Sequence, residues 1–247
     1  MSSMPIILAQ QSVEVHPVGY GYYNAYVVKC KGKALLVDTG IHSKEKKLVK
    51  NIKKAGVNPR DITLIVLTHS HGDHVGGVTR FQKRYKTPVI LHKGGLAAAK
   101  RGTIDSLKIG TPKVKLAAFI HRKVHRHFPP FSPSITMYND TLRLDKYGFE
   151  GASLIAVGGH SAGSLILSIG DIVFAGDLVR GSLVPGFRKK PAYHFFADDK
   201  REVYQRILTL LEQNYTIWYV GHGGPLDASK IRDFVRDHPL VPSYDTP

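Results

Sequence analysis

The sequence predicts an α/β fold in which two sheets lie back to back between two layers of helices, a four-layer αββα sandwich. Short apolar runs, several of them stopped by glycine, occur in both halves of the chain. Such runs are typical of buried strands. Amphipathic stretches flank them in each half, so helices are expected on the outer faces of both sheets.

The first half contains five predicted strands and three predicted helices. The strands are expected at residues 13–16, 24–30, 34–38, 62–67 and 88–92. One helix is expected over residues 44–55, because Leu48 and Ile52 share a face and Gly56 ends the pattern. The other two helices are expected over residues 74–85 and 95–101.

The second half repeats this organisation. Its strands are expected at residues 153–157, 164–169, 172–175 and 216–220, and its helices at residues 198–213 and 226–236. Gly170 and Asp171 lie between two of these strands and predict a hairpin turn.

Two stretches break the pattern. Residues 102–147 contain the run Phe128-Pro129-Pro130-Phe131, which cannot continue a regular helix. Residues 180–196 follow a predicted strand without a clear period. Long irregular segments in compact domains are often lids or binding loops, so both stretches are expected to determine the substrate, with 102–147 as a candidate lid.

Composition favours a soluble enzyme. The 247 residues are expected to form one domain over residues 1–247. No run reaches the roughly eighteen consecutive apolar residues of a membrane span, and the start of the chain lacks a secretory signal pattern, so no membrane association is expected. A single cysteine, Cys30, excludes an internal disulfide and is compatible with a cytoplasmic location. The oligomeric state is left open.

The formal net charge of +16 indicates either a nucleic-acid partner or an anionic substrate. Basic residues cluster at 44–54, 122–126 and 188–190. The first cluster lies on the outer side of a predicted helix, and only the third is expected near a site. We therefore expect a small-molecule substrate and no nucleic-acid partner. Three histidines near the second cluster are interpreted as solvated surface rather than a metal site: His121, His125 and His127.

Three imidazoles and a carboxylate follow the predicted strand 62–67 within six positions. They are His69, His71, Asp73 and His74. Neutral imidazole and carboxylate oxygen are ligands that zinc and similar divalent ions accept. A catalytic zinc usually takes three protein ligands and leaves a position open, so four ligand-type residues here favour a pair of metals rather than one.

Three more ligand-type residues follow predicted strands in the second half. His160 comes after Gly158 and Gly159, while Asp177 and His222 each follow one glycine. Each has the same local pattern: a short apolar strand, glycine that permits close backbone approach, then one potential ligand. The chain therefore offers enough ligands for a binuclear site.

The order His-x-His-x-Asp-His, Gly-His, Gly-Asp and Gly-His resembles the metallo-β-lactamase-fold hydrolase superfamily over nearly the whole chain. The resemblance implies two divalent ions, with zinc first and iron or manganese as alternatives. It implies three ligands for one ion (His69, His71 and His160), three for the other (Asp73, His74 and His222) and Asp177 as a bridge. It also implies that Asp38, at the end of the strand 34–38, lies beneath the metal motif and orients a ligand. The alternative role for Asp38 is to cap the turn before Thr39 and Gly40.

The resemblance implies hydrolysis in which a water molecule between the two ions supplies hydroxide and Asp73 helps to orient it as a catalytic residue. Aspartate at position 177, where antibiotic-hydrolysing members typically use cysteine or lack the carboxylate, favours the glyoxalase II-like and lactonase-like branch over a true β-lactamase. The expected substrate is a lactone or thioester. The alternatives are a phosphodiesterase or nuclease of the same fold and a persulfide-dioxygenase-like oxidoreductase.

Aromatic and charged residues near the predicted site are candidates for substrate binding. They are Tyr22, Tyr23, Arg188, Tyr193 and His194. The first two lie in a glycine-containing turn between early strands, and the last three lie in the irregular segment after Asp177. Ordinary packing of these aromatic groups onto the core is the competing interpretation.

Overall fold

The computed structural model describes residues 13–104, 127–182, 184 and 186–240. Its first sheet has six strands in the order β1-β2-β3-β4-β5-β6. These are β1 (Val13–Pro17), β2 (Tyr26–Cys30), β3 (Lys33–Val37), β4 (Ile62–Val66), β5 (Val89–His92) and β6 (Ile135–Met137). The first three pair antiparallel, and β3 to β6 pair in parallel. The carboxyl ends of β3 and β4 therefore lie at one edge.

The second sheet also has six strands, in the order β14-β13-β10-β9-β8-β7. They are β7 (Thr141–Arg143), β8 (Ala152–Ala156), β9 (Leu165–Ile169), β10 (Ile172–Gly176), β13 (Ile217–Val220) and β14 (Leu226–Asp227). The strands β8, β10 and β13 run in the same direction, because β9 pairs antiparallel with both β8 and β10, and β10 pairs in parallel with β13. Their carboxyl ends share one edge.

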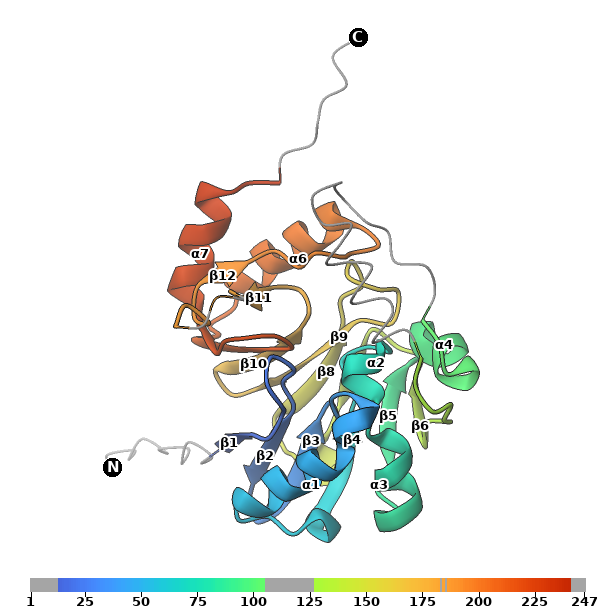
Figure 1. Ribbon diagram of the computed structural model, residues 1–247. Helices are drawn as coiled ribbons and strands as arrows, with labels where there is room; N and C mark the ends of the chain where they lie inside the picture. The colour runs from blue at the N-terminus through green and yellow to red at the C-terminus, as the bar shows by residue number, and fades with distance from the viewer. Residues whose placement is uncertain (1–12, 105–126, 183, 185, 241–247) are drawn as a thin grey trace, which may run out of the picture.

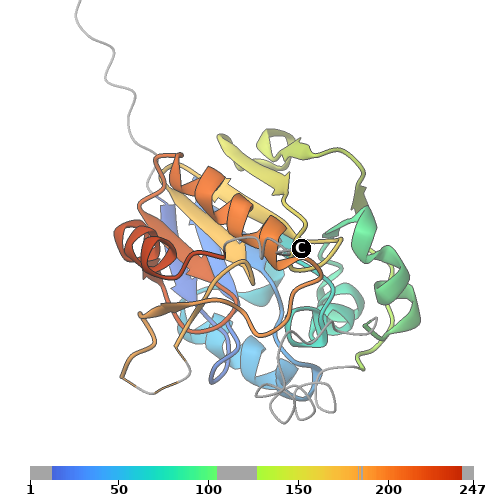
Figure 2. The same cartoon turned by 90° about the horizontal axis from the view of Figure 1, so that it is seen from above.

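Helices cover the outer faces of both sheets (Figures 1 and 2). Those packed on the first sheet are α1 (Glu45–Lys54), α2 (Gly72–Val75), α3 (Val78–Tyr85) and α4 (Leu96–Arg101). Those packed on the second sheet are α6 (Lys200–Leu211) and α7 (Ala228–Asp237). Short 3₁₀ turns complete the connections: η1 (His42–Lys44), η2 (Pro59–Asp61), η3 (Lys93–Gly95) and η5 (Asp145–Tyr147). The fold is the predicted αββα sandwich.

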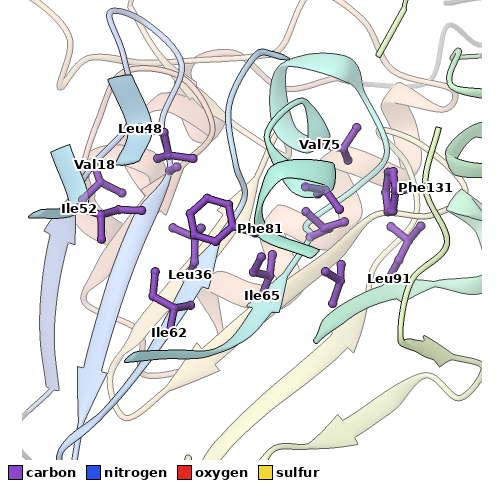
Figure 3. Packing of buried hydrophobic residues seen from close by; sticks show 14 of the residues in the cluster. Val18, Leu36, Leu48, Ile52, Ile62, Ile65, Val75, Phe81, Leu91 and Phe131 are labelled. Carbon is purple, nitrogen blue, oxygen red and sulfur yellow. The ribbon is translucent and has the colours of Figure 1, made fainter. Parts of the chain in front are cut away.

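Alternation of side chains along the strands of the first sheet separates two cores. Leu36 and Ile65 point toward Ile52 of α1 and Phe81 of α3, as Figure 3 shows. Their chain neighbours point to the opposite face of the sheet, because successive side chains of a strand alternate. There Leu35, among others, packs against the second sheet. One strand thus contributes to both the helix–sheet and the sheet–sheet core.

The outer face of the second sheet packs on α6 and α7. Trp218 of β13 is fully buried there, with Ile207 of α6 and Ile231 of α7 in the same cluster. Asp199 caps α6, since its side chain accepts hydrogen bonds from the N–H groups of Arg201 and Glu202. A two-stranded ribbon, β11 (Arg180–Gly181) and β12 (Pro191–Ala192), lies beside α7 (Figure 1).

The helix predicted over residues 74–85 is broken into α2 and α3. The break falls at Gly76 and Gly77, where the loop after β3 lies against the backbone. A Cβ on Gly76 would lie 2.1 Å from the His42 nitrogen, and one on Gly77 would lie 2.9 Å from the Thr39 oxygen. These glycines permit the close approach, and the first helix ends at Val75 while the next begins at Val78.

The segment 102–147 is less irregular than predicted. Its last part forms β6, at an edge of the first sheet, and β7, at an edge of the second. Both strands have only three residues, which is too short for a clear period of alternation in the sequence. The middle of the segment, including His121 and His125, lies outside the described residues. His127 is exposed and pairs with Thr103 in an isolated bridge.

Among the described residues, no helix combines the length and hydropathy that crossing a membrane requires.

We expect Phe81→Ala to lower the free energy of unfolding by about 3–5 kcal/mol, because it removes a fully buried ring from the centre of the helix–sheet core. Urea denaturation followed by circular dichroism measures the loss. Tyr138→Ala is the matched control, since that ring is 63% exposed, and it should change stability by less than about 0.5 kcal/mol. Equal losses in both variants would contradict this packing.

Candidate metal centre

Four strand ends from two sheets meet at one place. β4 leads into His69, β8 leads to His160, β10 leads to Asp177 and β13 leads to His222. The Leu165 N–H donates to the Thr68 carbonyl at 2.8 Å, so the two sheets are joined by a hydrogen bond next to the first ligand-type histidine. Because all four strands present their carboxyl ends here, residues distant in sequence come together.

The segment after β4 turns from extended chain into helix within three residues. His71 is extended, with φ −75° and ψ 148°, and α2 starts at the next residue. The His74 N–H donates to the His71 carbonyl at 2.9 Å. Because of this turn, the four ligand-type side chains between residues 69 and 74 can reach one buried space rather than alternate between two faces.

All seven ligand-type residues predicted from the sequence come together in that space, and all are at least nine-tenths buried. Two groups have their ligand atoms within 4.8 Å of one another. One group is His69, His71, His160 and Asp177, and the other is Asp73, His74 and His222. A third combination adds a residue that the sequence suggested only as a substrate contact: Asp177, His194 and His222.

The spacing of the ligand atoms suits divalent metal ions. Two atoms that each lie about 2.0–2.1 Å from a tetrahedral zinc are about 3.3 Å apart. His71 Nδ1 lies 3.2 Å from His160 Nε2, and Asp73 Oδ2 lies 3.4 Å from His222 Nε2. Side chains whose contact was only steric would not need their lone pairs to converge in this way.

Several buried polar atoms at the centre have no hydrogen bond, which is a second sign that a cation fits here. These atoms are the Nε2 atoms of His69, His74 and His222 and the Oδ1 atom of Asp177. A buried polar atom without a partner costs about 1–3 kcal/mol, and four such atoms in one cluster are costly. Coordination of a metal satisfies them together.

Asp177 lies between the two groups. Its Oδ2 atom is within 3.8 Å of Nε2 atoms from five histidines: His69 at 3.8 Å, His74 at 3.5 Å, His160 at 3.6 Å, His194 at 3.2 Å and His222 at 3.3 Å. One carboxylate therefore reaches nitrogens of both groups. This is the placement that a shared ligand requires.

Asp38 orients His74 from beneath. Its Oδ2 accepts a hydrogen bond from His74 Nδ1 at 2.8 Å, and its two oxygens also accept from the N–H and the hydroxyl of Thr68, each at 2.8 Å. With Nδ1 engaged, His74 directs Nε2 at the cluster. Asp38 has φ +58°, a left-handed conformation that is uncommon for residues other than glycine, so three hydrogen bonds compensate for local strain.

Backbone carbonyls orient two other imidazoles in the same way. His160 Nδ1 donates to the Phe196 carbonyl at 2.9 Å, and His222 Nδ1 donates to the Tyr22 carbonyl at 3.2 Å. A carbonyl can only accept, so the proton is on Nδ1 and the lone pair on Nε2 faces Asp177. The loop at residues 194–196 and the turn at residues 20–23 therefore set the tautomers.

Burial lowers the pKa of three of the imidazoles, to about 3 in His71 and below the usual value in His69 and His160. They are accordingly neutral at physiological pH. Neutral imidazole is the form that binds metals.

The remaining groups are dominated by charge. Burial alone would raise the pKa of Asp177, but the imidazoles of His222, His194 and His74 outweigh it and hold that pKa well below its usual range. Burial alone would lower the pKa of His74 and of His222, but nearby carboxylates, Asp177 first, raise both. The site therefore holds an ionised carboxylate whose charge draws in cations.

Two of the glycines that precede a ligand-type residue are required by close packing. A Cβ on Gly221 would lie 2.1 Å from Asp177 Oδ1 and 2.6 Å from an atom of the His74 ring. Gly176 has φ +52° and packs its Cα side against Thr68. The Gly-Asp and Gly-His pairs in the sequence thus report how closely the strand ends approach the cluster.

The suggested substrate residues fall into different places. The Tyr22 ring stacks on His222 with centroids 5.1 Å apart, and the Tyr23 ring meets His222 edge-on at 5.6 Å. Arg188 donates to the Gly21 carbonyl at 3.0 Å and so ties its loop to the same turn. His194 is buried beside Asp177.

Tyr193 is held elsewhere. Its ring packs on Tyr204 of α6 and Phe234 of α7, and its hydroxyl donates to the His238 carbonyl at 2.7 Å. These contacts anchor the loop to the outer helices rather than to the histidine cluster. Arg180, which the sequence did not single out, is buried near the cluster instead. The only signal for it was its position three residues after Asp177.

Residues 18–222 match the family model described as the metallo-beta-lactamase superfamily. The chain belongs to this superfamily. Among curated relatives, the probable metallo-hydrolase YqgX of Bacillus subtilis is 25% identical over 226 residues, which cover 88% of this chain and 92% of the relative. The chain is therefore a metallo-hydrolase-like member of the superfamily, with a His and Asp cluster suited to divalent metal ions.

Other curated relatives match over shorter stretches. The N-acyl homoserine lactonase AiiB of Agrobacterium fabrum is 29% identical over 100 residues, 32% of this chain and 35% of the relative. Ribonuclease TTHA0252 of Thermus thermophilus is 27% identical over 168 residues, 63% of this chain and 35% of the relative. Among solved structures, a metallo-beta-lactamase of Cronobacter sakazakii has a TM-score of 0.59 at 21% identity, covering 87% of this chain and 78% of its own. That likeness shows the fold.

We expect chelator-stripped protein to gain thermal stability when Zn²⁺ is added, because the ion binds the folded cluster and satisfies its buried atoms. Saturation at about 100 times the Kd adds about 2.7 kcal/mol, which raises the Tm by about 5–10 °C for a chain of this length. Differential scanning fluorimetry measures the shift. His69→Ala should lose most of it, whereas His127→Ala should keep it because His127 is exposed. A full shift in His69→Ala would argue against this cluster.

Proposed function

We propose that the chain is a binuclear metal-dependent hydrolase that cleaves a small ester-like substrate, a lactone or a thioester. The observation that carries the proposal is the position of Asp177, whose Oδ2 atom lies within 3.8 Å of imidazole nitrogens from both groups of ligand-type residues. A carboxylate placed in this way is suited to bridge two cations.

The proposed ligand sets follow the two groups. His69, His71 and His160 would hold one ion, and Asp73, His74 and His222 would hold the other. Nitrogen and oxygen donors of this mixture favour zinc, and they are also compatible with iron or manganese. The presence of all seven residues argues against a dioxygenase-like centre with a single iron.

Two divalent ions held by these residues would supply hydroxide at neutral pH, by lowering the pKa of water to about 7, and would polarise the bond under attack. The residues of the chain supply the positioning. Asp73, whose Oδ2 lies 3.4 Å from His222 Nε2, would accept a hydrogen bond from the attacking water and orient it. His194, whose ring centroid lies 4.8 Å from that of His160 and 5.3 Å from that of His222, would contact the substrate beside the cluster or, through Nε2 near Asp177, serve as a further ligand. Tyr22 and Tyr23 cover His222 and exclude water from its side of the cluster.

A carbonyl ester is favoured over a phosphodiester by the distribution of charge. The lysines of α1 are exposed, and among the described basic residues of the irregular segment Arg188 is tied to the turn that contains Tyr22, through the Gly21 carbonyl. A phosphodiesterase is the second candidate, since Arg180 and Arg188 both lie close enough to Tyr22 to influence its pKa, and one relative is named a ribonuclease.

The buried Cys30 supports a reducing, cytoplasmic setting. We also propose that residues 1–247 form one domain.

Elemental analysis and ester kinetics test the binuclear proposal together. We expect two metal ions per chain, about 3.5 Å apart, and a loss of kcat/KM of at least about 100-fold in Asp177→Ala, because the change removes a ligand from both ions. Ser161→Ala is the matched control. Its hydroxyl pairs with Ser164, and the residue adjoins His160 in the chain without offering a metal ligand in the two groups.

One ion or none per chain after reconstitution would refute the binuclear proposal, and equal losses in Asp177→Ala and Ser161→Ala would show that the roles are wrongly assigned. His194→Ala separates the two uses of that residue. Retention of both ions with a raised KM supports a substrate contact, and loss of one ion makes His194 a ligand.

Replacing Arg188, Lys189 and Lys190 together with alanine distinguishes the ester from the nucleic-acid candidate. If these exposed residues steer a small anionic substrate, kcat/KM should fall by a factor that shrinks as salt rises, since the Debye length is about 8 Å at physiological ionic strength. Metal content should stay the same. Two results together would instead favour the nuclease: the wild-type protein binds oligonucleotides with an affinity that falls steeply as salt rises, and it cleaves them only when metal is present.

A further inference from the structure

A buried arginine lies beside the metal cluster. Arg180 follows Asp177 by three residues, begins the strand β11 and has only 9% of its surface exposed. Arginine keeps its charge at every physiological pH. A buried charge is costly unless it is paired, so the partners of this side chain indicate what else it binds.

The contacts of Arg180 leave its charge without an acid. Nη1 donates to the Gly181 carbonyl at 3.0 Å and lies 3.5 Å from the Tyr22 hydroxyl. The guanidinium carbon lies 4.0 Å from the centroid of the Phe195 ring. Nε is buried without a hydrogen bond. Within the described part of the chain, Arg180 has no ion pair with Asp or Glu.

The groups around Arg180 connect it to the reaction centre. The Tyr22 ring stacks on His222, and the Gly181 N–H donates to the His222 carbonyl at 2.7 Å. On the other side, the Phe195 ring lies 6.1 Å from the ring of His194, which contacts Asp177. Each neighbour of the guanidinium is therefore also a neighbour of a residue in the cluster.

The guanidinium is held in a fixed plane. Stacking on Phe195 sets its face, and the Gly181 carbonyl fixes one arm of the fork. The Nε and Nη2 hydrogens remain on the side of the fork that matches the two oxygens of a carboxylate or phosphate. A preorganised fork that lacks an internal anion is suited to an anion brought by a ligand.

We propose that Arg180 binds a carboxylate or phosphate group that the substrate carries away from its scissile bond, which makes Arg180 a specificity-determining residue. This inference rests on the proposed hydrolase function, because it places the anion in the same substrate as the bond that is cleaved. Tyr22 and Phe195 position the guanidinium. The substrate class is accordingly an ester, lactone or thioester with a negatively charged substituent.

Matched substrates test the inference in the metal-loaded protein. 4-Nitrophenyl butyrate is neutral, and 4-nitrophenyl hydrogen glutarate adds a carboxylate at the far end of its acyl chain. Phenyl acetate and 4-acetoxyphenyl phosphate form a second pair with a pendant phosphate. The larger preference within a pair identifies the anion. Arg180→Met removes the charge, and Arg60→Met is the control, because Arg60 is exposed in η2 at the opposite end of β4.

We expect Arg180→Met to reduce the anionic-to-neutral ratio of kcat/KM by about 10- to 100-fold for the preferred pair, the loss that follows when a hydrogen bond to a charged group is removed. The change should lie mainly in KM. Arg180→Lys should restore part of the ratio, because the charge returns without the fork. Arg60→Met should leave the ratio at the wild-type value. An unchanged ratio in Arg180→Met, with both substrates still hydrolysed, would overturn the inference and leave the proposed function standing.

Binding without turnover makes the two failures distinguishable. Glutaric acid monoanilide is an amide analogue with the same pendant carboxylate, and butyranilide is its neutral counterpart. If the wild-type protein hydrolyses none of the esters, a saturable rise in Tm with the monoanilide that Arg180→Met abolishes supports the anion site although the proposed function fails. An equal rise in wild type and Arg180→Met, or no rise in wild type, would overturn the anion site.

Stability separates ligand binding from a structural role. Removal of a buried charge without an acidic partner should leave the Tm of Arg180→Met, without ligand, equal to or above that of the wild type. A large fall in Tm in both Arg180→Met and Arg180→Lys would show that the side chain serves to hold the loop, and the inference would be overturned.

Discussion

A buried carboxylate surrounded by imidazoles is the constraint on which the rest of the structure depends. Five histidine nitrogens lie 3.2–3.8 Å from one oxygen of Asp177, so they cannot all be protonated, because like charges at this spacing repel strongly in a buried site. Nor can the Nε2 atoms of His74, His160 and His222 donate to this oxygen while the rings are neutral, since the one proton of each ring is on Nδ1. Divalent cations satisfy the lone pairs and the carboxylate together. The fold must therefore bring these groups close and then hold their directions.

The two-sheet architecture meets both requirements. Because β8, β10 and β13 run in one direction and meet the end of β4, each strand needs to supply only one or a few ligands, and the sheet cores fix where each strand ends. Direction is set outside the cluster. Asp38 holds His74, the Phe196 carbonyl holds His160 and the Tyr22 carbonyl holds His222. The turn around residue 22 and the loop around residue 196 thus hold imidazoles of the cluster through backbone carbonyls, and the second of them also brings His194 beside Asp177.

Much of this arrangement was predictable from the sequence, and the limits have physical causes. Ligand-type residues after apolar strands could be found because strand, glycine and ligand are adjacent in the chain. The broken helix at Gly76 could not, because its cause is the backbone of residues 39–42 lying against it. The strands β6 and β7 were missed since three residues carry too little periodicity. Arg180 was missed, and Tyr193 was expected near the site but packs on Tyr204 and Phe234, because a two-residue strand and the loop after it carry no period that assigns a side chain to one face.

Charge balance links the metal centre to its surroundings. With two divalent ions in the proposed positions, the buried carboxylates of Asp38, Asp73 and Asp177 leave one positive charge uncompensated, and Arg180 adds another. A buried site tolerates such an excess poorly, while an anionic nucleophile and an anionic substituent on the substrate remove it. The same excess of positive charge would let the site discriminate between anionic and neutral substrates. A neutral analogue with the same reactive bond would displace water from the Arg180 guanidinium and leave it unpaired. Specificity would then arise from the anionic substituent of the substrate, which Arg180 binds and the metal ligands do not contact.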